Sequence, residues 1–398
     1  MSPQPTNPNP DLNRLISEGY EIEQKHGHLI MHGVPYVTED REVRRGKLIS
    51  ELTLAGNRTT RPSTHVMMFA GARPCDRFGR PLQKIINSES PNRIAEGLVA
   101  QFSFSSKPSC GYFGDYYAKM KTYADILESQ AQAIDSDVTA RTFRVIASSD
   151  RDSPFHYVDT ASSRAGITSL SKKLETEDVA IVGLGGTGSF VHDGLVKCPI
   201  QRIHTFDDDT YLQHNVFRSP GAASVEDLQA LPKKVHYYAD MYGKMHKGIH
   251  PNAVRVTKDN VDLLRPMDFV FLCMDASPDK KAIIDALTAF GTTFIDVGLG
   301  LDLVDGGLIG SVRITTSHAG NRDSSLQRIP LGGLGDANLY DRNIQVLELN
   351  ALGAMLAILK WKKLRGFYCD LEGETSTVFN VDGNHLLNEA LPCIRSVA

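Results

Sequence analysis

The 398-residue sequence has no long uncharged apolar run and no excess of either charge. No uncharged stretch approaches the roughly 20 residues that a membrane-spanning helix needs. Residues 1–12 (MSPQPTNPNPDL) are polar and proline-rich, unlike the apolar core of a secretion signal. The 43 basic and 47 acidic residues create no overall field that would gather nucleic acid or a membrane surface. We therefore expect a cytoplasmic protein that binds neither.

Cysteine is also scarce, and no two of the six cysteines have the Cys-x-x-Cys spacing of a structural zinc site. We expect reduced thiols. Cys273, inside an apolar strand, and Cys198, at a helix end, are expected to be inert. The six are Cys75, Cys110, Cys198, Cys273, Cys369 and Cys393.

The composition is that of a folded protein, with 41% apolar and 23% charged residues, and the length suits two domains. Short β-forming runs at 28–37, 47–55 and 64–70 precede a helical pattern at 112–134, where four tyrosines are expected to be core residues rather than a docking face. The polar stretch 148–163 is the expected linker. We predict a β-rich α+β domain over residues 1–160 and a second domain over 161–398.

The second half alternates strands and helices, which is typical of a parallel sheet covered by helices. The sequence therefore predicts an α/β, Rossmann-like domain with a mainly parallel sheet. The expected strands are 178–183, 202–207, 268–274 and 293–298, and the expected helices are 187–198, 232–248, 278–290 and the amphipathic 343–365.

A glycine-rich turn at residues 183–188 (GLGGTG) follows a buried strand and opens a helix. Backbone N–H groups and the helix dipole can receive phosphate oxygens in this setting, although such a turn can also serve only to pack a helix on a strand. Asp207, 19 residues past Gly188, can accept hydrogen bonds from ribose hydroxyls. Hydride transfer with NAD and adenylyl transfer with ATP both fit these features. The candidate nucleotide-binding glycines are Gly183, Gly185, Gly186 and Gly188.

The residues that follow separate the two chemistries. They are Asp207-Asp208-Asp209, Asn215-Val216-Phe217-Arg218, Pro232-Lys233-Lys234 and Cys273-Met274-Asp275. Over most of residues 176–315 this combination resembles the ThiF/MoeB and ubiquitin-activating-enzyme family, in which such elements surround ATP. The resemblance implies ATP-dependent adenylation of the C-terminal carboxylate of a ubiquitin-like or sulfur-carrier-like protein.

The residue types also suit the chemistry. Attack of a carboxylate on the α-phosphate builds negative charge on an anionic centre, so the site needs fixed cations and a metal. Arg218 offers a planar fork for phosphate oxygens, and Lys233 offers a point charge. Its neighbour Lys234 stays an alternative, although Lys233 follows the proline. Asp275 is the candidate magnesium ligand.

Other positions follow from the same resemblance. Asp209 and Asn215 are expected beside the nucleotide. The family also uses an upstream arginine, often supplied across a dimer; its usual Arg-Tyr-x-Arg-Gln form is missing, so Arg164 is our candidate and Arg342 its rival. The resemblance further implies a homodimer formed through the α/β domain.

The chain departs from many relatives because residues 316–340 contain no cysteine. No zinc is therefore expected, and the thiol of any thioester would have to be Cys75, Cys110 or Cys393. The whole chain resembles bacterial two-domain proteins whose genes often lie beside those of a ubiquitin-like protein and a conjugating enzyme. These two are the implied partners. An NAD-dependent oxidoreductase and a non-catalytic scaffold of the same fold remain the alternatives, and the role of the first domain stays open.

Overall fold

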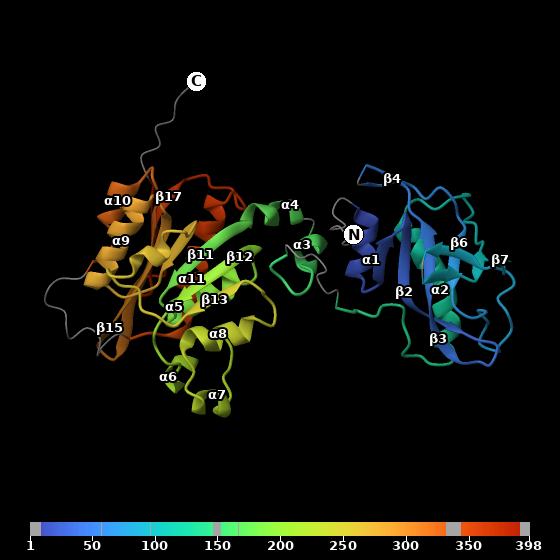
Figure 1. Ribbon diagram of the computed structural model, residues 1–398, viewed down its shortest axis with the longest axis horizontal. Coiled ribbons are helices and arrows are strands. Elements are labelled where there is room, and N and C mark those ends of the chain that lie inside the picture. The colour runs from blue at the N-terminus through green and yellow to red at the C-terminus, as the bar shows by residue number, and fades with distance from the viewer. Residues whose placement is uncertain are drawn as a thin grey trace, which may run out of the picture. The chain divides into compact units, whose positions relative to one another are not determined.

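The computed structural model of the protein describes residues 9–56, 58–95, 97–145, 153–165, 167–331 and 344–390. The described residues up to 145, together with those of 157–168, form one compact unit. Those of 153–156 and from 169 onward form a second unit (Figure 1). The residues around position 160, where the sequence suggested a boundary, thus pack with the first unit, whereas 153–156 pack with the second.

The first unit is built on a six-stranded antiparallel sheet of order β1-β2-β3-β6-β10-β7. Two short hairpins accompany it. The sheet strands are β1 (Glu21–Lys25), β2 (His28–Val37), β3 (Val43–Glu51), β6 (Met67–Ala70), β7 (Ile86–Ser88) and β10 (Phe102–Phe104), and the hairpins are β4 (Leu54–Ala55) with β5 (Arg58–Thr59) and β8 (Asn92–Ala95) with β9 (Leu98–Ala100).

Two helices, α1 (Pro10–Ser17) and α2 (Tyr116–Gln132), complete the core of this unit. Asp115 caps α2 by accepting a hydrogen bond from the Ala118 N–H. The helix buries residues three or four positions apart, including Tyr116, Tyr123 and Leu127, in one cluster with strand residues. The predicted β-rich domain with aromatic residues in its core is confirmed for Tyr116, Tyr117 and Tyr123. The fourth tyrosine expected in the core, Tyr112, precedes the helix and is 50% exposed, so that expectation is wrong.

The second unit contains an eight-stranded sheet of order β13-β12-β11-β14-β15-β16-β17-β18. The first five strands are parallel and the last three are added antiparallel, which confirms a mostly parallel α/β sheet. The strands are β11 (Thr176–Val182), β12 (Ile200–Phe206), β13 (Ile249–Asn252), β14 (Phe269–Leu272), β15 (Thr293–Val304), β16 (Gly307–Ser317), β17 (Glu374–Asn380) and β18 (His385–Ala390).

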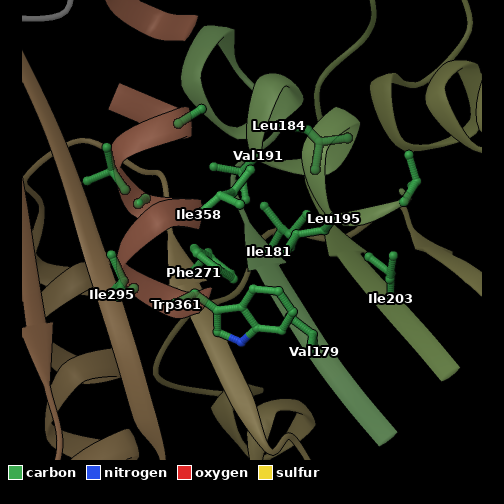
Figure 2. Packing of buried hydrophobic residues seen from close by; sticks show 14 of the residues in the cluster. Val179, Ile181, Leu184, Val191, Leu195, Ile203, Phe271, Ile295, Ile358 and Trp361 are labelled. Atoms are coloured by element: carbon green, nitrogen blue, oxygen red, sulfur yellow. The ribbon is translucent and has the colours of Figure 1, made fainter. Parts of the chain in front are cut away.

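Helices cover both faces of this sheet. On one face, α5 (Gly186–Leu195) and α11 (Leu347–Leu364) pack on alternate strand residues, and Trp361 of α11 lies close to Val179 and Phe271 (Figure 2). On the other face, α9 (Pro278–Phe290) packs on the intervening residues. The remaining helices are α3 (Thr160–Arg164), α4 (Thr168–Ser171), α6 (Gln213–Val216), α7 (Val225–Gln229), α8 (Lys234–Tyr242), α10 (Arg322–Leu326), η1 (Lys172–Leu174) and η2 (Val261–Leu264).

Two predicted elements differ from the structure. The helix expected at 232–248 ends at Tyr242 because Gly243 follows it, and the strand expected at 293–298 continues to Val304 as one arm of a long hairpin with β16. Among the described helices, none combines the length and apolar character needed to cross a membrane.

Candidate active site

A pocket of about 570 Å³ lies where β11, β12 and β14 end. The chain continues from β11 to the neighbouring strand β12 and places β14 on the other side, so the order of the sheet reverses direction here. Ligands of open parallel sheets bind at such a carboxyl edge, because the loops from adjacent strands separate there. The topology therefore marks this pocket as the candidate active site.

The glycine turn forms one wall of the pocket. Three of the candidate nucleotide-binding glycines, Gly183, Gly185 and Gly186, line it. Gly183 has a φ of +90°, and a Cβ at this position would lie 2.5 Å from the carbonyl oxygen of Cys273. Gly188 does not line the pocket, and a Cβ there would overlap the carbonyl oxygen of Gly183. Gly188 thus permits the close packing of α5 on β11, and the glycines that line the pocket precede it.

Asp207 connects this turn to the end of β12. Its carboxylate accepts hydrogen bonds from the backbone N–H of Leu184 at 2.7 Å and of Asp209 at 2.9 Å. Asp207 lines the pocket together with Asp208 and Asp209. The carboxylate predicted to contact a ribose is therefore also the group that fixes the shape of the glycine turn.

Of the two adjacent lysines, Lys234 is the one that lines the pocket. Its ammonium lies 2.5 Å from the carboxylate of Asp209 and 3.6 Å from that of Asp207, and its residue is 6% exposed. Lys233, which the sequence favoured, does not line the pocket; its ammonium donates a hydrogen bond to the carbonyl of Asp208. Lys234 shares a helix face with the buried Tyr238, four residues on, and this periodicity is the signal that could have identified it.

The candidate phosphate-binding arginine, Arg218, lines the pocket. Its Nε is buried without a hydrogen-bond partner, and among the described residues no carboxylate lies within ion-pair distance of it. Asn215 does not line the pocket. Its Oδ1 accepts a hydrogen bond from the N–H of Leu212, and its carbonyl accepts one from the N–H of Arg218, so Asn215 shapes the turn that carries the arginine.

Two sets of carboxylates could hold a metal ion. Asp275, the predicted ligand, lines the pocket just beyond β14. Carboxylate oxygens of Asp207, Asp208 and Asp209 lie within 4.8 Å of one another on the neighbouring loop. Magnesium prefers oxygen ligands and usually takes only one or two protein carboxylates, so the residues present suit this ion.

A buried ionic group beside the pocket was missed at the level of sequence. Asp296 is 0% exposed and lies 2.5 Å from the ammonium of Lys280 and 2.8 Å from the guanidinium of Arg313. Both cations line the pocket. The signals were single charges inside the apolar stretches 293–298 (TFIDVG) and 311–316 (SVRITT), but only the pairing of β15 with β16 brings these charges together.

The predicted arginine Arg164 ends α3, and its side chain lies outside the described residues, as do Arg342 and Cys393. Burial raises the pKa of the Cys75 and Cys273 thiols, which disfavours the nucleophilic thiolate. Cys110 is exposed, and its thiol donates a hydrogen bond to the carbonyl of Tyr112.

Comparisons with known proteins match two different families to the first and second parts of the chain. Residues 160–319 match the ThiF family, and residues 10–160 match a domain of unknown function, DUF6791. The chain is 28% identical over 157 residues to Ubiquitin-like modifier-activating enzyme 5 of Mus musculus, covering 37% of the chain and 39% of that relative. It is 26% identical over 163 residues to the Dictyostelium discoideum protein of the same name, covering 37% and 41%. The chain thus spans about two fifths of the length of these relatives.

Similar solved structures include E. coli MccB with ATP and PaaA. The MccB structure is 15% identical with a TM-score of 0.44, covering 58% of this chain and 69% of MccB. The PaaA structure is 15% identical with a TM-score of 0.41, covering 56% of this chain and 75% of PaaA.

Proposed function

We propose that this chain, which carries a ThiF-family domain over residues 160–319 behind a DUF6791 domain, is an adenylyltransferase. It would use ATP and magnesium to activate the C-terminal carboxylate of a ubiquitin-like or sulfur-carrier-like protein. The observation that carries the proposal is a pocket lined by the glycine turn, by Lys234 and by Arg218, whose Nε is buried without a partner among the described residues.

The proposed reaction forms a bond between a carboxylate oxygen of the acceptor and the α-phosphorus of ATP. The bond from that phosphorus to its bridging oxygen breaks, and pyrophosphate leaves with the electron pair. Arg218 and Lys234 would stabilise the negative charge that develops on the phosphate oxygens. Asp275 would hold magnesium, which supplies further charge neutralisation at the phosphates.

A nicotinamide-dependent oxidoreductase is the alternative. It accounts for the glycine turn and Asp207 but gives no role to Arg218 or Lys234. Stoichiometric binding of NAD without binding of ATP would favour it over adenylation, and binding of neither would favour a non-catalytic scaffold.

The proposed cellular setting rests on the resemblance of the whole chain. We propose a cytoplasmic homodimer that receives a ubiquitin-like protein and transfers it to a conjugating enzyme. A monomer in sedimentation measurements would contradict the dimer without affecting the chemistry.

Exchange of labelled pyrophosphate into ATP, measured with a ubiquitin-like protein as the acceptor, tests the reaction. Arg218→Gln is expected to lower kcat/KM for exchange about 100-fold, since hydrogen bonds to charged groups contribute about 1.5–3 kcal/mol each. Arg265→Gln is the control, because Arg265 is exposed and pairs only with Asp262 among the described carboxylates. Equal exchange by the two variants would contradict the proposed site.

A further inference from the structure

Lys280 is a buried lysine in the first turn of α9, where it is 2% exposed. Its ammonium lies 2.5 Å from Oδ1 of Asp296, and the other oxygen of that carboxylate accepts a hydrogen bond from Arg313. Asp296 pairs in register with Leu272, so it lies beside the end of β14. A buried charge is costly without a partner, and the ion pair with Asp296 therefore fixes where the ammonium lies.

The loop 274–277 lies between β14 and α9, and Lys280 contacts both of its ends. The ammonium donates a hydrogen bond to the carbonyl of Met274 at 3.2 Å. The backbone N–H of Lys280 donates to the hydroxyl of Ser277, the N-cap of α9, also at 3.2 Å. One residue thus holds the loop from both sides, and Asp275 lies between the two contacts.

These contacts indicate that Lys280 orients the loop rather than binding phosphate. Met274, Asp275 and Lys280 all line the pocket. An ammonium has three N–H donors, and two of those of Lys280 are directed to the Asp296 carboxylate and the Met274 carbonyl. Because its charge is paired and its side chain is buried, Lys280 offers little to a ligand directly. Its main effect falls on the backbone that carries Asp275.

We propose that Lys280 is a positioning residue for the metal ligand that the proposed function assigns to Asp275. By holding the Met274 carbonyl, Lys280 fixes the direction in which the next residue presents its carboxylate to the pocket. Groups that orient a metal ligand typically contribute about 10- to 100-fold to metal affinity. This inference rests on the proposed function, in which Asp275 holds magnesium beside the nucleotide. Asp296 acts one step further away, since it holds Lys280.

The ratio of two ATP affinities tests this role. ATP is titrated calorimetrically into the full-length protein, once with magnesium and once with EDTA. Because ATP also binds magnesium in solution, the ratio reports only what the protein adds to metal binding. The wild-type protein is expected to bind ATP at least about tenfold more tightly with magnesium, and Asp275→Asn should lose this gain.

Lys280→Gln should lower the ratio to about that of Asp275→Asn. A cation that only lay near the metal would repel it, so its removal would raise the ratio instead. In the Asp275→Asn background, Lys280→Gln should change the ratio less than about twofold, because a residue that acts through Asp275 has no ligand left to orient. Lys281→Gln is the matched control, since Lys281 is exposed and pairs with Asp285, and it should keep the wild-type ratio.

A second variant covers the case in which the single substitution does not fold. Lys280→Gln combined with Asp296→Asn removes one buried charge of each sign, and it should show the same loss of the magnesium gain. A ratio as large as that of the wild-type protein in either variant would overturn the positioning role. No gain from magnesium in the wild-type protein would also overturn it, while leaving ATP binding intact. Absence of ATP binding by the wild-type protein would instead contradict the proposed adenylation.

Discussion

The ammonium of Lys234 lies 2.5 Å from the carboxylate of Asp209, whereas the adjacent Lys233 turns its ammonium to the carbonyl of Asp208. Helix α8 begins between these two positions, since Lys233 is its N-cap and Lys234 its first residue. The start of the helix therefore directs one lysine into the pocket and the other toward solvent.

This difference predicts unequal effects for two neighbouring substitutions. Lys234→Ala is expected to weaken ATP binding about 10- to 100-fold, because it removes a largely buried charge that, in the proposed site, would face the phosphates. Lys233→Ala should change the affinity less than about twofold, as expected for an exposed lysine. Isothermal titration with ATP compares them directly. A larger loss in Lys233→Ala would show that the phosphates lie on the other side of the helix start.

The glycine turn allows ligand contact to be separated from packing. A Cβ at Gly185 would meet no protein atom within 4 Å, whereas a Cβ at Gly188 would overlap the carbonyl of Gly183. Gly185→Ala should therefore keep the melting temperature within about 2 °C and lose ATP affinity, since the methyl group blocks phosphate approach. Gly188→Ala should lower the melting temperature by several degrees, because overpacking costs about 1–3 kcal/mol. Thermal melts with and without ATP measure both effects, and a normal melt for Gly188→Ala would refute the packing role.

Much of the second unit could be predicted because the sequence patterns that indicate its strands and helices are local. The ThiF resemblance is confirmed for residues 160–319 and the α/β class for the second unit. The strand, turn and helix around Gly183 follow from a continuous stretch of sequence. The β15–β16 hairpin was missed because the glycines of 298–307 obscure its alternation, although Asp305-Gly306, both at positive φ, is a hairpin turn signal.

Side-chain partners were harder to predict than elements. Asp296 and Arg313 are 17 residues apart and meet only through the register of two strands. Asn215 carries a family signature, yet its amide is used within its own turn. Sequence spacing thus located the loops around the pocket, while the direction of each side chain depended on register and on where a helix starts.

His192 gives the fold an acid-sensitive point away from the pocket. It is 0% exposed on α5, its ring packs against Tyr242, and neither ring nitrogen has a partner among the described residues. Burial lowers its pKa to about 3, with the nearby His246 adding to the effect. The unfolded chain therefore binds a proton at this residue more readily than the folded chain does. As a result, the free energy of unfolding is independent of His192 ionisation above about pH 6.5, and it falls as the pH drops from 6.5 to 3.

His192→Leu should reduce this loss of stability. The wild-type protein is expected to lose about 2 kcal/mol at pH 5 through this residue, and the variant should not. At pH 7.5 the variant should be as stable as wild type or more so, because it removes two unpaired buried nitrogens. Urea unfolding at both pH values measures the difference, with the exposed His236→Gln as control. An unchanged pH dependence in His192→Leu would show that other groups control acid stability.

Asp275 provides the test of the metal. It lines the pocket directly after β14, where its carboxylate would hold a magnesium ion bound with the nucleotide. Asp275→Asn should raise the magnesium concentration for half-maximal pyrophosphate exchange at least tenfold. Binding of ATP without magnesium should be unchanged or tighter, because the substitution removes a negative charge beside the triphosphate. Asp262→Asn, at an exposed residue, is the control. If Asp275→Asn instead keeps the wild-type magnesium dependence, the ion is held by the carboxylates of Asp207, Asp208 and Asp209, and substitution of these should then produce the shift.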